Sequence, residues 1–163
     1  MARVLIVGCG CRGTSLAGRL VAGGIEARGT TRDEARLPLI EAAGAQAALA
    51  DPARLATLTP HLDGVSAVAW LLGSAKGSPE EVASLHGPRL ASLLETMVDT
   101  HARGLVYEAA GSVERALLER GAATAREASD TYRMPIEVVT ADPGDHRAWL
   151  EACAGAVRAV LSA

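Results

Sequence analysis

The 163-residue sequence contains no phenylalanine, and aromatic residues make up only 2% of it. It also lacks a basic excess, because its formal net charge is −3. Surfaces that bind nucleic acids usually carry positive charge, and single-strand platforms need aromatic rings on which bases stack. The composition therefore predicts a protein that does not bind nucleic acid.

Long apolar runs and cysteine pairs are missing as well. No run approaches the ~20 residues of a membrane-spanning helix, and the run from Val4 to Val7 is too short for a signal-peptide core. The three cysteines form no framework of the kind that secreted scaffolds use. We expect a soluble, cytoplasmic protein without a membrane partner, folded as one domain over residues 1–163 with no separate substrate domain.

What the sequence does contain is a regular alternation of short apolar runs and helical segments. This alternation predicts an α/β protein with a three-layer, doubly wound parallel sheet of about six strands, the Rossmann fold. The expected strands are residues 3–7, 25–29, 45–50, 65–72, 104–107 and 136–140. The expected helices are residues 12–22, 33–43, a short one opening at Asp51-Pro52, one capped by Ser78, and residues 89–101, 112–129 and 145–161.

A glycine-rich loop, Gly8-x-Gly10-x-x-Gly13, follows the first expected strand and opens the first helix. In a dinucleotide fingerprint the first glycine makes a tight turn, the second admits a pyrophosphate, and the third allows close helix–strand packing. The free N–H groups at the helix N-terminus favour phosphate. The loop therefore predicts a dinucleotide site, with contacts from Gly8, Gly10, Cys11, Arg12 and Gly13.

The end of the second strand indicates which dinucleotide is preferred. NAD sites usually place Asp or Glu there for the ribose hydroxyls, whereas this chain has Thr30, Thr31 and Arg32. Two hydroxyls and a guanidinium suit a 2′-phosphate, and Arg12 offers a second cation. We predict NADP(H) as the preferred cofactor, with NAD(H) possible because Asp33 follows directly.

The run Val4 to Gly10 also resembles the first motif of S-adenosylmethionine-dependent methyltransferases. Such enzymes need an acid at the end of the second strand to hold ribose hydroxyls. The residues Thr30 to Arg32 do not provide one. The methyltransferase is thus kept as the weaker alternative.

The stretch from Val4 to Leu72 resembles the nucleotide-binding half of the NAD(P)-dependent epimerase/dehydratase branch of the short-chain dehydrogenase/reductases, especially its atypical members. The matching segments are Val-Gly-Cys-Gly-Cys-Arg-Gly, Gly-Thr-Thr-Arg, Ala-Asp-Pro and Gly-Val-Ser-Ala-Val-Ala-Trp-Leu-Leu-Gly. The resemblance implies that Asp51 lies near the adenine and that Leu72 and Gly73 line the cofactor.

The chain departs from this family where catalysis is concerned. Family reductases use a Tyr-x-x-x-Lys pair, in which lysine lowers the tyrosine pKa. Tyr107 and Tyr132 lack that lysine, since Lys76 is the only one in the chain. The family's Ser or Thr at the end of the fifth strand is replaced around Glu108.

Two functions follow from this departure. One is a minimal or degenerate oxidoreductase, completed across a possible homodimer. The other is a non-catalytic redox sensor or accessory subunit that binds NADP(H).

For the histidines, the cysteines and Tyr107, the sequence favours structural roles over functional ones. The four histidines show no metal-ligand spacing, so no metal site is predicted. His86 is expected to be a surface residue at a helix end, and Cys153 a core residue. Cys9-x-Cys11 is interpreted as a pair of small turn residues. Tyr107 is interpreted as an ordinary strand-end residue, with a Tyr107/Glu108 acid–base pair at this ligand-binding edge of the sheet as the weaker alternative.

Overall fold

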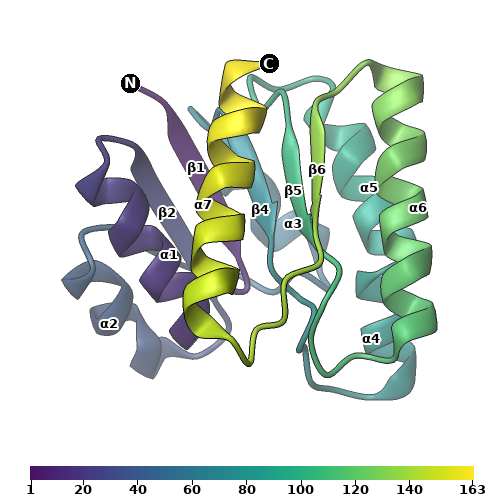
Figure 1. Ribbon diagram of the computed structural model, residues 1–163, viewed down its shortest axis with the longest axis horizontal. Helices are drawn as coiled ribbons and strands as arrows, with labels where there is room; N and C mark the ends of the chain where they lie inside the picture. The colour runs from purple at the N-terminus through teal and green to yellow at the C-terminus, as the bar shows by residue number, and fades with distance from the viewer.

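Six parallel strands form one sheet at the centre of the molecule, whose computed structural model describes residues 1–163. Their order across the sheet is β3-β2-β1-β4-β5-β6, so the direction of winding reverses between β1 and β4 (Figure 1). In sheets of this kind ligands bind beyond the carboxyl ends of the strands at that reversal. The strands are β1 (Arg3–Val7), β2 (Glu26–Thr31), β3 (Gln46–Leu49), β4 (Ala67–Trp70), β5 (Leu105–Glu108) and β6 (Ile136–Val139).

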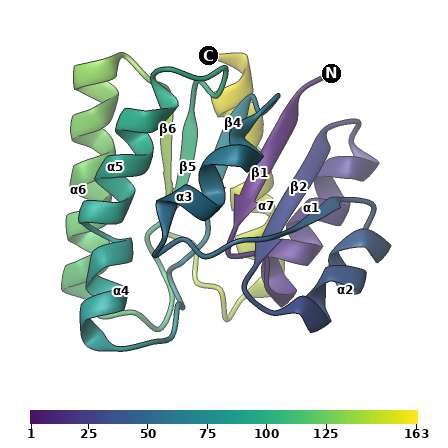
Figure 2. The same ribbon diagram turned by 180° about the vertical axis from the view of Figure 1, so that it is seen from behind.

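Helices cover both faces of this sheet, as Figures 1 and 2 show from opposite sides. One face carries α1 (Cys11–Ala22), α2 (Leu37–Ala42) and α7 (His146–Ser162). The other carries the short α3 (Leu55–Leu58), then α4 (Pro79–Leu85), α5 (Pro88–Met97) and α6 (Arg115–Tyr132). Two short 3-10 helices, η1 (Glu34–Arg36) and η2 (Thr59–Leu62), complete the chain.

The alternation of side chains along β1 explains why two cores form. Leu5 and Val7 belong to the core beneath α3 to α6, whereas Val4 and Ile6 belong to the core beneath α1, α2 and α7. All four are fully buried. A strand buried on both faces needs apolar residues at every position, and this is why the run reads as continuously hydrophobic.

The predicted fold class is confirmed, and several element boundaries need correction. The helix expected to open at Asp51-Pro52 begins at Leu55, because the Asp51 carboxylate accepts the Ala53 N–H in a turn. The helix expected to reach residue 101 ends at Met97, whose carbonyl accepts the Thr100 hydroxyl.

Of two further predictions at helix ends, one needs correction and the other is confirmed. The helix expected from residue 112 begins at Arg115 and extends to Tyr132, because the Val113 N–H is used by the carbonyl of Gly73. The predicted Ser78 cap is confirmed, since its side chain accepts the Glu81 N–H. None of the helices has both the length and the apolar composition that crossing a membrane requires.

Candidate functional site

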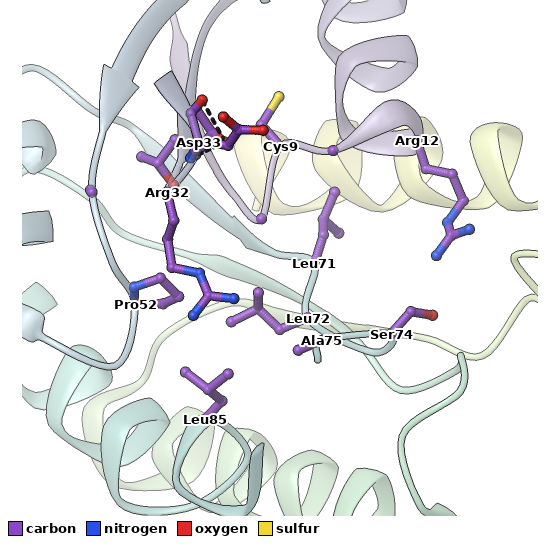
Figure 3. Close-up of a pocket in the computed structure, with 15 residues that line it drawn as sticks. Cys9, Arg12, Arg32, Asp33, Pro52, Leu71, Leu72, Ser74, Ala75 and Leu85 are labelled. Carbon is purple, nitrogen blue, oxygen red and sulfur yellow. Dashed lines mark hydrogen bonds between the residues drawn. The ribbon is translucent and has the colours of Figure 1, made fainter. Parts of the chain in front are cut away.

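A cavity of about 430 Å³ lies beyond the carboxyl ends of β1, β2, β3 and β4, on both sides of the point where the strand order reverses. Figure 3 shows that Arg32 and Arg12 lie at its two ends, with Leu71 and Leu72 between them. Its lining residues come from the end of β2, from the loops that follow the four strands, from the first turn of α1 and from α4. They are Gly8, Cys9, Gly10, Arg12, Thr30, Thr31, Arg32, Asp33, Ala50, Pro52, Leu71, Leu72, Ser74, Ala75 and Leu85.

The three glycines of the loop after β1 differ in what an added side chain would meet. Gly8 has a φ of +83°, and an added Cβ there would lie 2.6 Å from the Leu71 carbonyl oxygen. A Cβ on Gly13 would lie 3.1 Å from the Gly8 oxygen, so this glycine permits the close packing of α1 on β1. A Cβ on Gly10 would have no heavy atom within 4 Å. Gly10 therefore leaves open space in front of α1, which the fold itself does not require.

The N-terminus of α1 faces this open space. Its N-cap is Gly10, which has no side chain to accept the N–H groups of the first turn. Those groups have no partner within an α-helix, and the helix dipole adds partial positive charge. The loop thus presents donors and positive potential to an anion.

The end of β2 adds a polar wall to the same cavity. Thr30 is only 1% exposed, and its buried hydroxyl has no hydrogen-bond partner in the protein. A buried hydroxyl without a partner costs free energy, so such groups are rare in native structures. Arg12 and Arg32 also line the cavity, and neither takes part in any of the three salt bridges of the protein. The wall therefore carries two cations without a salt bridge, and Thr30 contributes a buried hydroxyl without a partner in the protein.

Two of the residues assigned by resemblance lie outside this lining. The Asp51 carboxylate faces its own turn, where it accepts the Ala53 N–H at 2.9 Å, and its neighbours Ala50 and Pro52 line the cavity instead. The Gly73 N–H donates to Glu108 Oε1 at 2.8 Å. Of the expected residues, the larger cavity gathers Gly8, Gly10, Arg12, Thr30, Thr31, Arg32 and Leu72, whereas Cys11 and Gly13 line a smaller cavity beside it.

That smaller cavity, of about 150 Å³, is lined by a buried carboxyl group, Glu108, which the sequence suggested only as the weaker alternative of an acid–base pair with Tyr107. Glu108, at the end of β5, is 2% exposed, and its two oxygens accept the Gly73 N–H and the Trp149 indole N–H at 2.8 and 2.7 Å. Burial raises the pKa of Glu108, while the two N–H donors and the charge of Arg12 act in the opposite direction. The only signal for Glu108 in the sequence was its position, because it is an acid at the end of a central strand.

Tyr107 has its side chain on the other face of the sheet and bonds to His86. His86 is 1% exposed, so the expectation of a surface histidine is wrong. Its Nε2 lies 2.9 Å from the Leu72 carbonyl and must donate to it, so Nδ1 of the neutral ring accepts the Tyr107 hydroxyl at 2.6 Å. Burial lowers the pKa of His86 and raises that of Tyr107, so both groups stay uncharged. This pair anchors the loop after β4 from within the core.

Neither tyrosine nor the single lysine is among the residues that line the larger cavity. Tyr107 is fully buried, and Tyr132 lies at the C-terminus of α6, at the opposite edge of the sheet (Figure 1). Lys76 is exposed in the loop before α4. No three histidine, cysteine or acidic side chains lie together in a way that would hold a metal ion. Cys153 is buried, as predicted.

No protein-family model and no curated protein matches the chain. Solved structures match its fold. BdcA from E. coli is 19% identical, with a TM-score of 0.70 over 96% of this chain and 88% of its own. A short-chain dehydrogenase/reductase superfamily protein from Agrobacterium tumefaciens with bound NAD is 16% identical, with a TM-score of 0.69 over 85% of this chain. The Citrobacter sp. triphenylmethane reductase complexed with NADP(H) is 15% identical, with a TM-score of 0.63, again over 85% of this chain.

The chain spans 48% of the length of each of the last two structures, and about half of several others. NAD-dependent epimerases are among the matches as well. The fold is therefore the Rossmann fold that these short-chain dehydrogenase/reductases and epimerases also have, as the resemblance in the sequence implies.

Proposed function

We propose that the chain binds NADP(H) in the larger cavity and NAD(H) more weakly. The 2′-phosphate would lie against Arg32 and the hydroxyls of Thr30 and Thr31, and the pyrophosphate against Gly10, Arg12 and the N-terminus of α1. The observation that carries the proposal is this one cavity with two unpaired cations, a bare helix N-terminus and a buried hydroxyl without a partner.

The residues present fit such a ligand. The space in front of Gly10 would be filled by any side chain at this position, yet the fold leaves it empty. The Thr30 hydroxyl lacks the partner that a ligand oxygen would supply. Arg32 is the specificity determinant, because guanidinium binds phosphate oxygens in a bidentate manner.

For activity, the proposal is a minimal or degenerate oxidoreductase of the short-chain dehydrogenase/epimerase type. The cofactor, when bound, supplies or accepts a hydride. The chain's own part is to hold and orient it, because neither tyrosine lines the cavity and the single lysine has no tyrosine four residues before it. In this form of the proposal a second copy in a homodimer supplies the missing acid–base group.

The alternative, a non-catalytic NADP(H) sensor or accessory subunit, is favoured by one observation. Tyr107 and Glu108, the polar residues at the end of β5, are both consumed by internal hydrogen bonds. Groups held in this way stabilise the fold and are not free to exchange protons with a substrate.

Titration of the purified protein with NADPH, NADH and S-adenosylmethionine tests the binding proposal, with Trp70 and Trp149 fluorescence and thermal unfolding as readouts. A ligand that binds only the folded state raises the melting temperature by mass action. We expect a shift with NADPH at micromolar concentration and a smaller one with NADH. A shift with S-adenosylmethionine alone would replace the dinucleotide with the methyltransferase alternative.

A second measurement separates the enzyme from the sensor. NADPH oxidation is followed with a panel of aldehydes and ketones, and the sedimentation coefficient reports on self-association. Turnover with any carbonyl substrate contradicts the sensor. NADPH binding without turnover, in a protein that sediments as a monomer, contradicts the oxidoreductase.

A further inference from the structure

The smaller cavity connects Glu108 with the glycine loop. Its lining residues come from that loop, from the ends of β4 and β5, and from α7. They are Gly8, Gly10, Cys11, Arg12, Gly13, Leu71, Glu108 and Trp149. Its 150 Å³ is the volume of about five liquid water molecules, enough for one planar ring but not for a second nucleotide.

The position of this cavity along a bound dinucleotide follows from the residues that it shares with the larger one. Both are lined by Gly8, Gly10, Arg12 and Leu71. In the proposed function, on which this inference rests, the adenosine lies at the Arg32 end and the pyrophosphate at Gly10 and Arg12. The remaining nucleoside must continue past Arg12, and Glu108 lines the cavity on that side.

Two hydrogen bonds hold the carboxyl group of Glu108 beside this cavity. Its oxygens are held from two directions, by the loop after β4 through the Gly73 N–H and by α7 through the Trp149 indole. Both partners are donors, which favour the ionised form of a carboxyl group, while burial is the larger effect and raises its pKa. When ionised, the side chain holds its negative charge at a fixed, buried position, where charges interact more strongly than in water.

The charges around Glu108 determine what it can attract. Arg12 is the cation that acts on it, and in the proposed complex that guanidinium is engaged by the pyrophosphate. Cys153 lies close enough that Glu108 contributes to raising its thiol pKa, so this neighbour is neutral. Trp149 carries no charge. A bound pyrophosphate therefore leaves the carboxylate without a competing cation.

We propose that Glu108 makes the site selective for the oxidised cofactor. The oxidised nicotinamide ring carries a positive charge and the reduced ring carries none, so a fixed carboxylate nearby stabilises only the oxidised ring. The protein then binds NADP⁺ about tenfold or more tightly than NADPH. For a two-electron couple, a tenfold ratio lowers the reduction potential of the bound cofactor by about 30 mV. The site thereby reports the oxidised fraction of the nucleotide pool.

The experiment compares dissociation constants for NADP⁺, NADPH and adenosine 2′,5′-bisphosphate, which lacks the nicotinamide, by calorimetry. The proteins are the wild type, Glu108→Gln and the control Glu119→Gln, whose side chain is exposed on α6. In the wild type and in the control, NADP⁺ should bind about tenfold more tightly than NADPH. In Glu108→Gln the ratio should fall to about one, mainly because NADP⁺ binds more weakly, while the bisphosphate is unaffected.

Each contrary result has a distinct meaning. Equal wild-type affinities for NADP⁺ and NADPH overturn the inference and leave the proposed function intact, and this measurement does not depend on whether the variant folds. Equal weakening of all three ligands in Glu108→Gln also overturns it, because that pattern indicates a structural role. Absence of binding by all three ligands to the wild type refutes the proposed function itself.

Discussion

The polar groups around the larger cavity and those at the end of β5 differ in whether the protein itself satisfies them. Arg12 and Arg32 line the cavity and form no salt bridge, and the buried Thr30 hydroxyl has no hydrogen-bond partner. At the end of β5, Tyr107 and Glu108 are satisfied by His86, Gly73 and Trp149. Unsatisfied polar groups persist where a ligand completes them, whereas satisfied ones stabilise the fold. In the proposed function the residues around the larger cavity bind the cofactor, whereas the hydrogen bonds at the end of β5 hold the neighbouring loop and α7 in place.

The largest effect on cofactor binding is expected from Gly10→Val. A Cβ at this position has no heavy atom of the protein within 4 Å, so we expect little effect on folding, but the side chain occupies the space in front of α1. Loss of two charge-assisted contacts, each worth about 1.5–3 kcal/mol, weakens NADPH binding by about 100-fold or more. Calorimetry and thermal unfolding together check both statements.

Gly8→Val is the matched contrast to that variant. Its positive φ and the 2.6 Å approach to the Leu71 oxygen make it lower the melting temperature even without a ligand. If instead Gly10→Val lowers the melting temperature as much as Gly8→Val does, Gly10 is part of the fold and not of a binding site.

Arg32→Ala tests which cofactor the larger cavity prefers. Removing one guanidinium–phosphate contact should weaken NADPH binding by about tenfold or more and leave NADH binding unchanged. Arg54→Ala, at an exposed position outside the cavity, serves as the control and should change neither. Equal losses for NADPH and NADH would mean that Arg32 does not contact the 2′-phosphate.

Tyr107→Phe tests whether the hydrogen bond between Tyr107 and His86 stabilises the fold without contributing to cofactor binding. It leaves His86 Nδ1 buried without a donor, which should lower the free energy of unfolding by about 1–2 kcal/mol. NADPH affinity should change less than twofold, because the hydroxyl does not reach the cavity. Urea unfolding measures the first quantity and calorimetry the second. Tyr132→Phe, at an exposed tyrosine, should leave both unchanged, and a selective loss of affinity in Tyr107→Phe would assign this residue to the site.

The smallest effect is a pH dependence at Glu108. Because folding raises the pKa of this carboxyl group above its ordinary value of 4.5, the folded state binds the proton more tightly than the unfolded chain. Its contribution to stability is therefore fully present below pH 4.5 and is lost as the pH rises through the folded-state pKa. Relative to the wild type, Glu108→Gln should gain stability from pH 4.5 to 7.5 in urea unfolding. The opposite slope would mean that the two N–H donors outweigh burial.

The order of elements could be predicted from the sequence because each strand is a short apolar run and each helix has a local start or stop signal. The six strands, the Ser78 cap and the loop from Gly8 to Gly13 all depend on residues that are close neighbours in the chain. Local hydrogen bonds that compete with the helix moved the boundaries at Leu55 and Met97. Sequence patterns do not resolve that competition.

The polar residues that line the larger cavity could also be predicted from the sequence, because they lie in two short segments at the ends of adjacent strands. Arg12 and Thr30 to Arg32 are brought together simply by the parallel pairing of β1 and β2. Asp51 followed the family pattern in sequence, but its carboxylate turned to its own backbone, and this orientation depends on local geometry.

By itself, the sequence determined the parallel sheet, the glycine loop and the residue types at the end of β2, since short-range spacing and hydrophobicity specify all three. Only the tertiary structure decided the states of His86, Tyr107 and Glu108. His86 pairs with a tyrosine 21 positions away, and Glu108 with an indole 41 positions away. Burial and hydrogen bonding across such distances depend on how the layers pack, and packing is a property of the folded chain that local patterns do not encode.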